Sequence, residues 1–257
     1  MNYLNASRTR HCSQDSHGLG AALRRQADRL ATTLLPQSCA ICGAWAGGEA
    51  VCARCAPVLP RLPEPRCPTC SDRSPAGDVC ARCAAEPHQF DRVVAALAYA
   101  PPVDDLIQSL KYGHQLHLAR WFGNVLADRL LAEPDVGTWK APIIIPMPLH
   151  PERLAERGFN QAAEISRTVA RRLGQPLLVD ACVRVRATAP QTRLGLDERR
   201  GNVRNAFECR QSLSGHTVIL VDDVLTSGAS LDELARTARM HGATRIIAAV
   251  VGRTLHG

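Results

Sequence analysis

The sequence contains few aromatic residues and almost no lysine. Phe, Trp and Tyr make up 4% of the 257 residues, and of the 31 basic residues only those at 111 and 140 are lysines. Surfaces that bind single-stranded nucleic acid by base stacking need aromatic side chains among their cations, so this mode of binding is disfavoured. The cations are almost all arginines, whose planar guanidinium groups match the geometry of phosphate.

A long apolar run is also lacking. No stretch approaches the length that crosses a bilayer, and the first thirty residues contain no apolar core of the kind found in secretory signals. We therefore expect a soluble, cytoplasmic protein with no membrane insertion. Its apolar fraction of 46% is that of a globular protein, and the length allows one large domain and a small one.

Cysteine is abundant and regularly spaced. Eight of the eleven cysteines form two blocks with the spacing C-x2-C-x9-C-x2-C, each ending in Val-Cys-Ala-Arg-Cys. The blocks comprise Cys39, Cys42, Cys52 and Cys55, then Cys67, Cys70, Cys80 and Cys83. A C-x2-C pair directs two thiolates at one tetrahedral ion, and two pairs complete a closed site. The repeat predicts two structural zinc ions.

Other interpretations of the cysteines are weaker. Disulfides are disfavoured without an export signal, a redox pair explains one C-x2-C motif but not four, and a ribbon that had lost its metal would not need all its ligands. The spacing leaves open whether ligands pair within a block or between blocks. Cys12, Cys182 and Cys209 are expected to be packing or surface thiols. Between Cys39 and Phe90 five arginines are balanced by five acids, so we expect structural support or protein contact rather than nucleic-acid binding.

The stretch from Thr217 to Ser230 carries the second strong signal. Val218 to Val221 predicts a buried strand, and Asp222 and Asp223 follow it, at the strand end where open α/β sheets bind ligands. A hydroxyl-rich turn comes next, formed by Thr226, Ser227, Gly228, Ala229 and Ser230, and an amphipathic helix is predicted from Leu231. Free N–H groups at a helix start attract anions, so the turn suits a phosphate. The alternative is an ordinary junction in which acids and serines cap the helix.

A second apolar segment, Pro142 to Pro146, is expected to be a strand that leads into a rigid loop. Pro146, Met147 and Pro148 open this loop, and Arg153 and Arg157 follow four residues apart. On a helix these two guanidinium groups share one face and could bind a pyrophosphate. The alternative is a solvated face in which they pair with the neighbouring glutamates.

Positive charge gathers in this half of the chain. Between Pro151 and Arg204 there are eleven basic and six acidic residues. A loop expected from Val183 to Asn205 contributes Arg199 and Arg200 among others. We divide the chain into a disordered N-terminus (1–18), a helix plus double zinc-ribbon module (19–90) and an α/β domain (91–257).

These motifs together resemble the ComF family of bacteria. The resemblance runs from about Leu34 to Val251 and rests on the two cysteine blocks, Leu-Lys-Tyr-Gly at 110–113, Pro-Met-Pro-Leu-His-Pro-Glu-Arg at 146–153, Arg-Gly-Phe-Asn-Gln at 157–161 and Val-Asp-Asp-Val-Leu-Thr-Ser-Gly at 221–228. Further matches are Arg184, Thr188, Gln191, Leu194, Arg199, Arg200 and Asn202. The resemblance implies a type I phosphoribosyltransferase fold, a mainly parallel sheet flanked by helices, behind a double zinc ribbon.

The resemblance also implies roles for residues. Asp222 and Asp223 would take the ribose hydroxyls of phosphoribosyl pyrophosphate, residues 226–230 its 5′-phosphate, and the loop from Pro146 to His150 its pyrophosphate with Mg2+. Members of the family are associated with natural competence and with incoming single-stranded DNA.

Two functions from different classes follow. The first is a phosphoribosyltransferase that displaces pyrophosphate with a nitrogen nucleophile. The second is a non-catalytic adaptor that binds single-stranded DNA or a DNA-uptake ATPase. Purine-salvage relatives carry an acid at the position of Thr226, and a hydroxyl does not ionise near neutral pH, so transfer to their bases is not expected.

Overall fold

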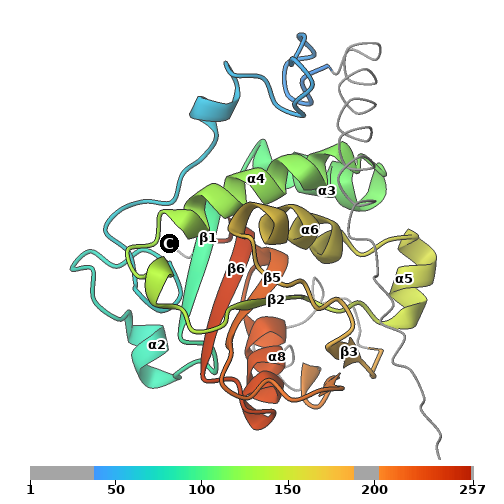
Figure 1. Ribbon diagram of the computed structural model, residues 1–257. Coiled ribbons are helices and arrows are strands. Elements are labelled where there is room, and N and C mark those ends of the chain that lie inside the picture. Colours follow the sequence, from blue (N-terminus) through green and yellow to red (C-terminus); the bar gives the residue numbers. More distant parts are fainter. Residues whose placement is uncertain (1–37, 188–202, 256–257) are drawn as a thin grey trace, which may run out of the picture. The chain divides into compact units, whose positions relative to one another are not determined.

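The computed structural model describes residues 38–187 and 203–255 (Figure 1). The disordered N-terminus predicted for 1–18 and the helix predicted to follow it lie outside the described residues. So do Arg199 and Arg200. The chain divides into two compact units, residues 1–52 and residues 53–257. The second cysteine block therefore shares a unit with the α/β sheet, and our division into modules at residue 90 stays a proposal.

Four parallel strands form the sheet of the larger unit. They are β1 (Arg92–Ala98), β2 (Ile143–Pro146), β5 (Thr217–Leu225) and β6 (Arg245–Arg253), in the order β1-β6-β5-β2. Each is a nearly continuous apolar run because helices cover both faces of the sheet. The predicted α/β fold with a parallel sheet is confirmed.

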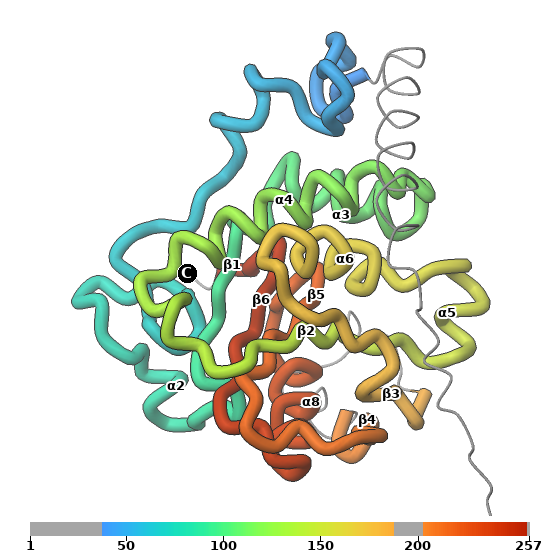
Figure 2. Tube along the Cα trace, viewed as in Figure 1, coloured from blue at the N-terminus to red at the C-terminus, as the bar shows by residue number. Residues whose placement is uncertain are grey.

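Helices pack on both faces of this sheet. On one face α4 (His117–Leu131) packs beside α6 (Gln161–Leu173), and α3 (Val103–Tyr112) packs against α4. On the other face lie α8 (Ala229–Met240) and a hairpin of β3 (Cys182–Arg184) and β4 (Phe207–Cys209) (Figure 1). Figure 2 shows β3 and β4 side by side, although they are far apart in sequence.

Alternation along β5 decides which way each side chain points. Val218 and Leu220 join the core that contains Leu231 and Leu234 of α8, whereas the buried Ile219 faces away from it. Continuing the alternation, residue 222 lies on the α8 side of the sheet and residue 223 on the α4 and α6 side. Neighbouring acids in the sequence thus reach opposite faces.

The remaining elements are short. They are the 3-10 helices η1 (Ala56–Val58) and η2 (Val136–Thr138), and the helices α2 (Ala81–Ala85) and α5 (Pro151–Arg157). Among the described residues, no helix is long and apolar enough to cross a membrane.

The structure corrects four details predicted from the sequence. The central strand does not end at Val221 but runs to Leu225, so both aspartates lie within β5, and α8 begins at Ala229 rather than Leu231. Residues 182–184 form a strand where a loop was expected from Val183. Cys182 and Cys209 were expected to be separate thiols, but they face each other across β3 and β4 and form a disulfide.

Candidate functional site

The two aspartates near the end of β5 occupy different surroundings. Asp223 is buried, with 4% of its surface exposed, whereas Asp222 is only partly buried. The backbone N–H of Asp223 donates to Oδ1 of Asp222 at 2.9 Å, which fixes the orientation of that carboxylate. One acid is held inside the protein and the other borders the open end of the sheet.

Asp223 is bound by side chains from two helices. Nζ of Lys111, near the end of α3, lies 2.5 Å from Oδ2 of Asp223, and Nε2 of Gln161, the first residue of α6, lies 3.5 Å from Oδ1. Gln161 also accepts a hydrogen bond from Arg157 at 2.6 Å. These contacts connect the buried acid to a cation at the edge of the site.

The same surroundings separate the acidities of the two aspartates. Burial raises the pKa of Asp222 well above its ordinary value, and the neighbouring charge of Asp223 raises it further. Burial is the largest effect on Asp223 and opposes its ionisation, but the charge of Lys111 and the hydrogen bonds with Asp222, Lys111 and Gln161 together outweigh it and leave the pKa lowered. The pair therefore holds one stable negative charge on Asp223, and Asp222 becomes a good acceptor once a cation arrives.

The turn after β5 has the geometry of an anion site. Gly228 is the N-cap of α8 and adopts a left-handed conformation at φ 84°, which a side chain would strain. Because the N-cap residue is glycine, neither the aspartates nor the serines fill that position. The contact from the Ala229 N–H to Oγ of Ser227 is long, at 3.5 Å. This favours the anion-binding interpretation over simple capping.

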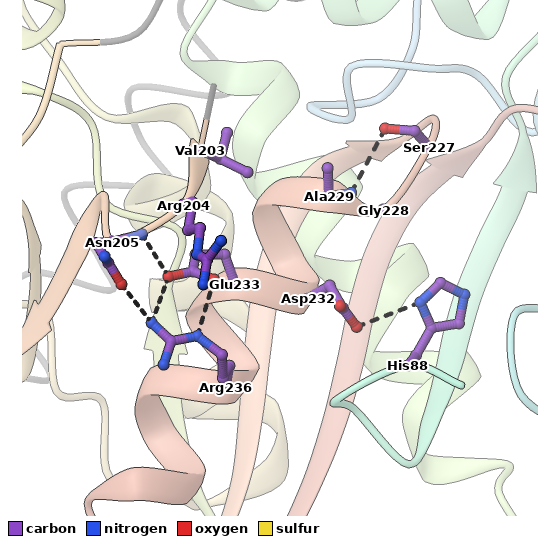
Figure 3. A pocket seen from close by; sticks show the side chains of 10 residues that line it. All are labelled: His88, Val203, Arg204, Asn205, Ser227, Gly228, Ala229, Asp232, Glu233 and Arg236. Atoms are coloured by element: carbon purple, nitrogen blue, oxygen red, sulfur yellow. Dashed lines mark hydrogen bonds and ion pairs between the residues drawn. The ribbon is translucent and has the colours of Figure 1, made fainter. Parts of the chain in front are cut away.

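A cavity of about 390 Å³ borders this turn (Figure 3). Its lining residues are His88, Val203, Arg204, Asn205, Ser227, Gly228, Ala229, Asp232, Glu233 and Arg236. The two acids among them already have partners: Asp232 accepts from the Gln89 N–H at 2.6 Å, and Glu233 pairs with Arg236 at 2.7 Å. Arg236 therefore offsets the negative charge of Glu233, and the Gln89 N–H holds the Asp232 carboxylate in place.

The loop after β2 lies directly beside the end of β5. Pro146 is the register partner of Val221, and the Met147 N–H donates to the Val221 carbonyl at 2.8 Å. Asn160, the N-cap of α6, donates to the Met147 carbonyl at 3.0 Å. The start of this loop is therefore held next to Val221, the residue before Asp222.

The two arginines of α5 differ from each other. Arg153 is exposed and pairs with Glu156 at 2.9 Å, which is the salt-bridged arrangement considered above as an alternative. Arg157 is half-buried, with its guanidinium 5.3 Å from the centre of the Tyr112 ring. Only Arg157 connects to the aspartate pair, through Gln161.

Three residues around the aspartates were not singled out as site residues from the sequence. They are Lys111, Gln161 and Arg184, the last of which lies over the Phe207 ring at 5.5 Å. Burial lowers the pKa of Arg184, and the charge of Asp222 acts against that shift. The signal that could have found all three is that they lie within the motifs on which the family resemblance rests.

The cysteines form two separate clusters, each from one block. In each cluster the four Sγ atoms lie within 4.8 Å of one another, so ligands group within blocks and do not cross. The Sγ atoms of Cys42 and Cys52 are 3.8 Å apart, as are those of Cys70 and Cys80. Tetrahedral zinc with Zn–S bonds of about 2.3 Å separates its ligands by about 3.8 Å, so the clusters fit the ion.

One thiol in each cluster has a lowered pKa and ionises more readily than an ordinary cysteine. Burial alone would raise the pKa of Cys39 and of Cys67, but backbone N–H groups, including those of Cys52 and Cys80, outweigh it and lower each to about 6. Thiolates are the form that binds metal. Both clusters are thus consistent with structural zinc.

Comparison with known proteins agrees with this arrangement. Residues 30–84 match the double zinc ribbon domain, and residues 160–257 match the phosphoribosyl transferase domain. The chain is 32% identical to DNA utilization protein YhgH of Escherichia coli O157:H7 over 229 residues, which cover 86% of this chain and 99% of that protein. It is 33% identical to competence protein F of Haemophilus influenzae over 171 residues, covering 65% and 75% of the two chains. With both domains present and similarity along nearly the whole of one relative, the chain belongs to the ComF/YhgH family, which joins a double zinc ribbon to a phosphoribosyltransferase domain.

Proposed function

We propose that this protein binds phosphoribosyl pyrophosphate, or another ribose phosphate, with Mg2+ at the end of β5, and that it works in the cytoplasm in natural competence and DNA uptake. The observation that carries the proposal is the succession of Asp222, Asp223 and the glycine turn beside the Met147 loop. The relatives named for DNA utilization and for competence support the cellular role.

The 5′-phosphate would bind at the turn of residues 226–230. Backbone N–H groups at the start of α8 point toward an anion there, and the helix dipole favours its negative charge. Thr226, Ser227 and Ser230 add hydroxyl donors.

The ribose would lie over Asp222. A carboxylate with a raised pKa is a good acceptor for a sugar hydroxyl or a metal-bound water, because either one stabilises its charged form. Asp223, already bound to Lys111, would hold the orientation of its neighbour and contribute charge rather than a direct contact.

The pyrophosphate would face Pro146, Met147 and Pro148, with Arg157 nearby and Arg153, Arg199 and Arg200 as further cations. Mg2+ would neutralise part of the pyrophosphate charge when bound. Arg184, whose charge interacts with that of Asp222, would lie next to the ribose.

A second function, binding without transfer, is favoured by Thr226. An adaptor with a ribose-phosphate site could recruit single-stranded DNA or a DNA-translocating ATPase, and arginines suit a phosphate backbone. Because Thr226 is a poor general base, ligand binding does not by itself imply catalysis.

Isothermal titration would test the proposal with three ligands: phosphoribosyl pyrophosphate, ribose 5-phosphate and an oligonucleotide. We expect saturable, Mg2+-dependent binding of phosphoribosyl pyrophosphate and weaker binding of ribose 5-phosphate. Arg153→Gln is the comparison variant: Arg153 is exposed and paired with Glu156, so its loss should weaken binding less than Arg157→Gln does. Binding of the oligonucleotide alone would favour the adaptor.

A further inference from the structure

One buried arginine joins the second cysteine cluster to the phosphate turn. Arg253, the last residue of β6, is 1% exposed. Its Nε donates to the Cys70 carbonyl at 2.9 Å, and its NH2 lies 3.2 Å from Oδ2 of Asp72. Its NH1 donates to the Thr226 carbonyl at 3.1 Å, and Thr226 is where the turn begins. A single guanidinium group therefore contacts both sites.

The cluster side of this link depends on the metal ligands. Cys70 is itself a ligand, and the Cys67 N–H donates to the Asp72 carbonyl at 2.8 Å, which closes the loop between them. Arg82 pairs with the Asp72 carboxylate at 2.8 Å. A metal that binds Cys67 and Cys70 would hold this loop, and with it the Cys70 carbonyl and the Asp72 carboxylate that Arg253 contacts.

The phosphate turn is also held in place, by hydrogen bonds at the end of β5 and to α8. Thr254 donates from its N–H to the Leu225 carbonyl at 3.0 Å, so β6 and the end of β5 are joined on both sides of Arg253. A second connection comes from His88 and Gln89, which follow the ribbon and bond Asp232 of α8. His88 also packs 3.7 Å from the position that a side chain on Gly228 would occupy.

An arginine buried to this extent cannot lose its partners without a large desolvation cost. If the cluster opens, Arg253 must either follow it or leave a charge unpaired, and both outcomes disturb the Thr226 carbonyl. The ribbon and the turn therefore share one buried guanidinium group, and a change at either one acts on the other, which is the requirement for coupling between sites.

We propose that Arg253 is a positioning residue through which metal at the second cluster sets the affinity of the phosphate turn. The second ribbon then acts as part of the ligand site, and the first cluster does not. The identity of the ligand, phosphoribosyl pyrophosphate, rests on the proposed function, whereas the coupling itself does not.

The first arm of the test compares Arg253→Gln with Arg245→Gln. Arg245 lies on the same strand and forms a partly buried ion pair with Asp135 at 2.5 Å, so its loss controls for general destabilisation. At a temperature where both variants are folded and hold two zinc ions, Arg253→Gln should bind phosphoribosyl pyrophosphate about tenfold more weakly, within the usual range for coupled sites. Equal affinity of the two variants would overturn the proposal.

The second arm replaces one ligand in each cluster and measures amide hydrogen exchange at residues 226–230. Cys70→Ser should speed exchange of these amides at least tenfold, and the matched Cys42→Ser should leave them unchanged. If Cys70→Ser does not fold, Asp72→Asn tests the same link with all ligands intact. No change in turn exchange would refute the coupling. Faster exchange in a protein that binds no phosphoribosyl pyrophosphate would instead refute the proposed ligand alone.

Discussion

At the scale of single residues, the site depends on two adjacent aspartates whose pKa values are shifted in opposite directions. Asp223 is ionised beside Lys111, whereas desolvation and the charge of Asp223 raise the pKa of the partly buried Asp222. Strongly shifted carboxyl groups of this kind are typical of functional sites.

The raised pKa of Asp222 predicts a pH-dependent stability. The folded-state pKa of Asp222 lies above the ordinary 3.8, so the folded protein tolerates the protonated carboxyl better than the charged one. The wild type therefore loses stability as pH rises from the ordinary value through the raised value. Asparagine has no proton to lose, so the melting temperature of Asp222→Asn minus that of the wild type should increase between pH 4 and pH 8. An increase of about 2 °C or more is expected for about 1 kcal/mol in a domain of this size.

The control for this measurement is Asp223→Asn, whose effect has the opposite sign. The folded-state pKa of Asp223 is lowered, so its carboxylate stabilises the folded protein at pH values above the ordinary pKa, and this stability is lost as pH falls. Asp223→Asn lacks the carboxylate and should therefore be less stable than the wild type at pH 7. If the melting temperatures of the two variants, relative to the wild type, changed with pH in the same direction, the raised pKa of Asp222 and the lowered pKa of Asp223 would be contradicted.

The residue at position 226 leads us to expect no transfer of a phosphoribosyl group to three common bases. Its hydroxyl is not ionised near neutral pH and cannot move a proton of the base. The segment from Val183 to Asn205, where other relatives use a lysine, contains arginines and no lysine, and an arginine stays protonated and is a poor general acid. We therefore expect no pyrophosphate release above background with hypoxanthine, guanine or orotate, as measured by a coupled pyrophosphate assay. Release that is lost in Asp223→Asn would show that another group supplies the missing base.

At the scale of elements, α4 and α6 approach closely at one glycine. A side chain on Gly123 would lie 2.8 Å from the Ile165 carbonyl and 2.5 Å from Cβ of Thr168, so the helices can meet only if this residue stays small. Gln161, which contacts Asp223, is the first residue of α6. Helix packing therefore helps to position the site.

This contact predicts that Gly123→Ala lowers the free energy of unfolding by about 1–3 kcal/mol, as overpacking does in other cores. Gly137→Ala is the matched control, because nothing lies within 4 Å of the added carbon. Urea unfolding measures both. A Gly123→Ala variant as stable as the wild type would mean that α4 and α6 separate freely.

Only some of the helices, strands and contacts around the site could be predicted from the sequence. The strands β2 and β5, and the place of the aspartates beside the glycine turn, followed from apolar runs and turn residues, which are local signals. Lys111 could not be assigned to Asp223 in this way, because the two meet only after α3 has packed near the sheet. The Cys182–Cys209 pair was missed for the same reason, since a 27-residue separation hides the β3–β4 pairing.

At the scale of the whole molecule, the two cysteine clusters belong largely to different compact units. Cys39, Cys42 and Cys52 fall within residues 1–52, and the whole second cluster falls within the unit of the sheet. Sequence spacing gave identical predictions for both blocks and could not foresee this difference. Metal loss should therefore have unequal consequences at the two clusters.

We predict two zinc ions per chain by elemental analysis of protein purified without chelator. Stepwise removal with a chelator should give two distinguishable events, and only loss from the second cluster should lower the melting temperature of the α/β unit, because Arg253 and Asp72 join them. Fewer than two zinc ions, or a single event that leaves the unit unaffected, would contradict this account.

The most direct test of the central claim is the affinity of wild-type protein and of Asp222→Asn for phosphoribosyl pyrophosphate. Asp222→Asn keeps the Lys111–Asp223 pair, so it removes the proposed ribose acceptor without leaving a buried lysine unpaired. The account predicts one-to-one, Mg2+-dependent binding to the wild type that weakens at least about tenfold in the variant, as expected for loss of a hydrogen bond to a charged group. No binding to the wild type at millimolar ligand, or equal affinity in the variant, would contradict it.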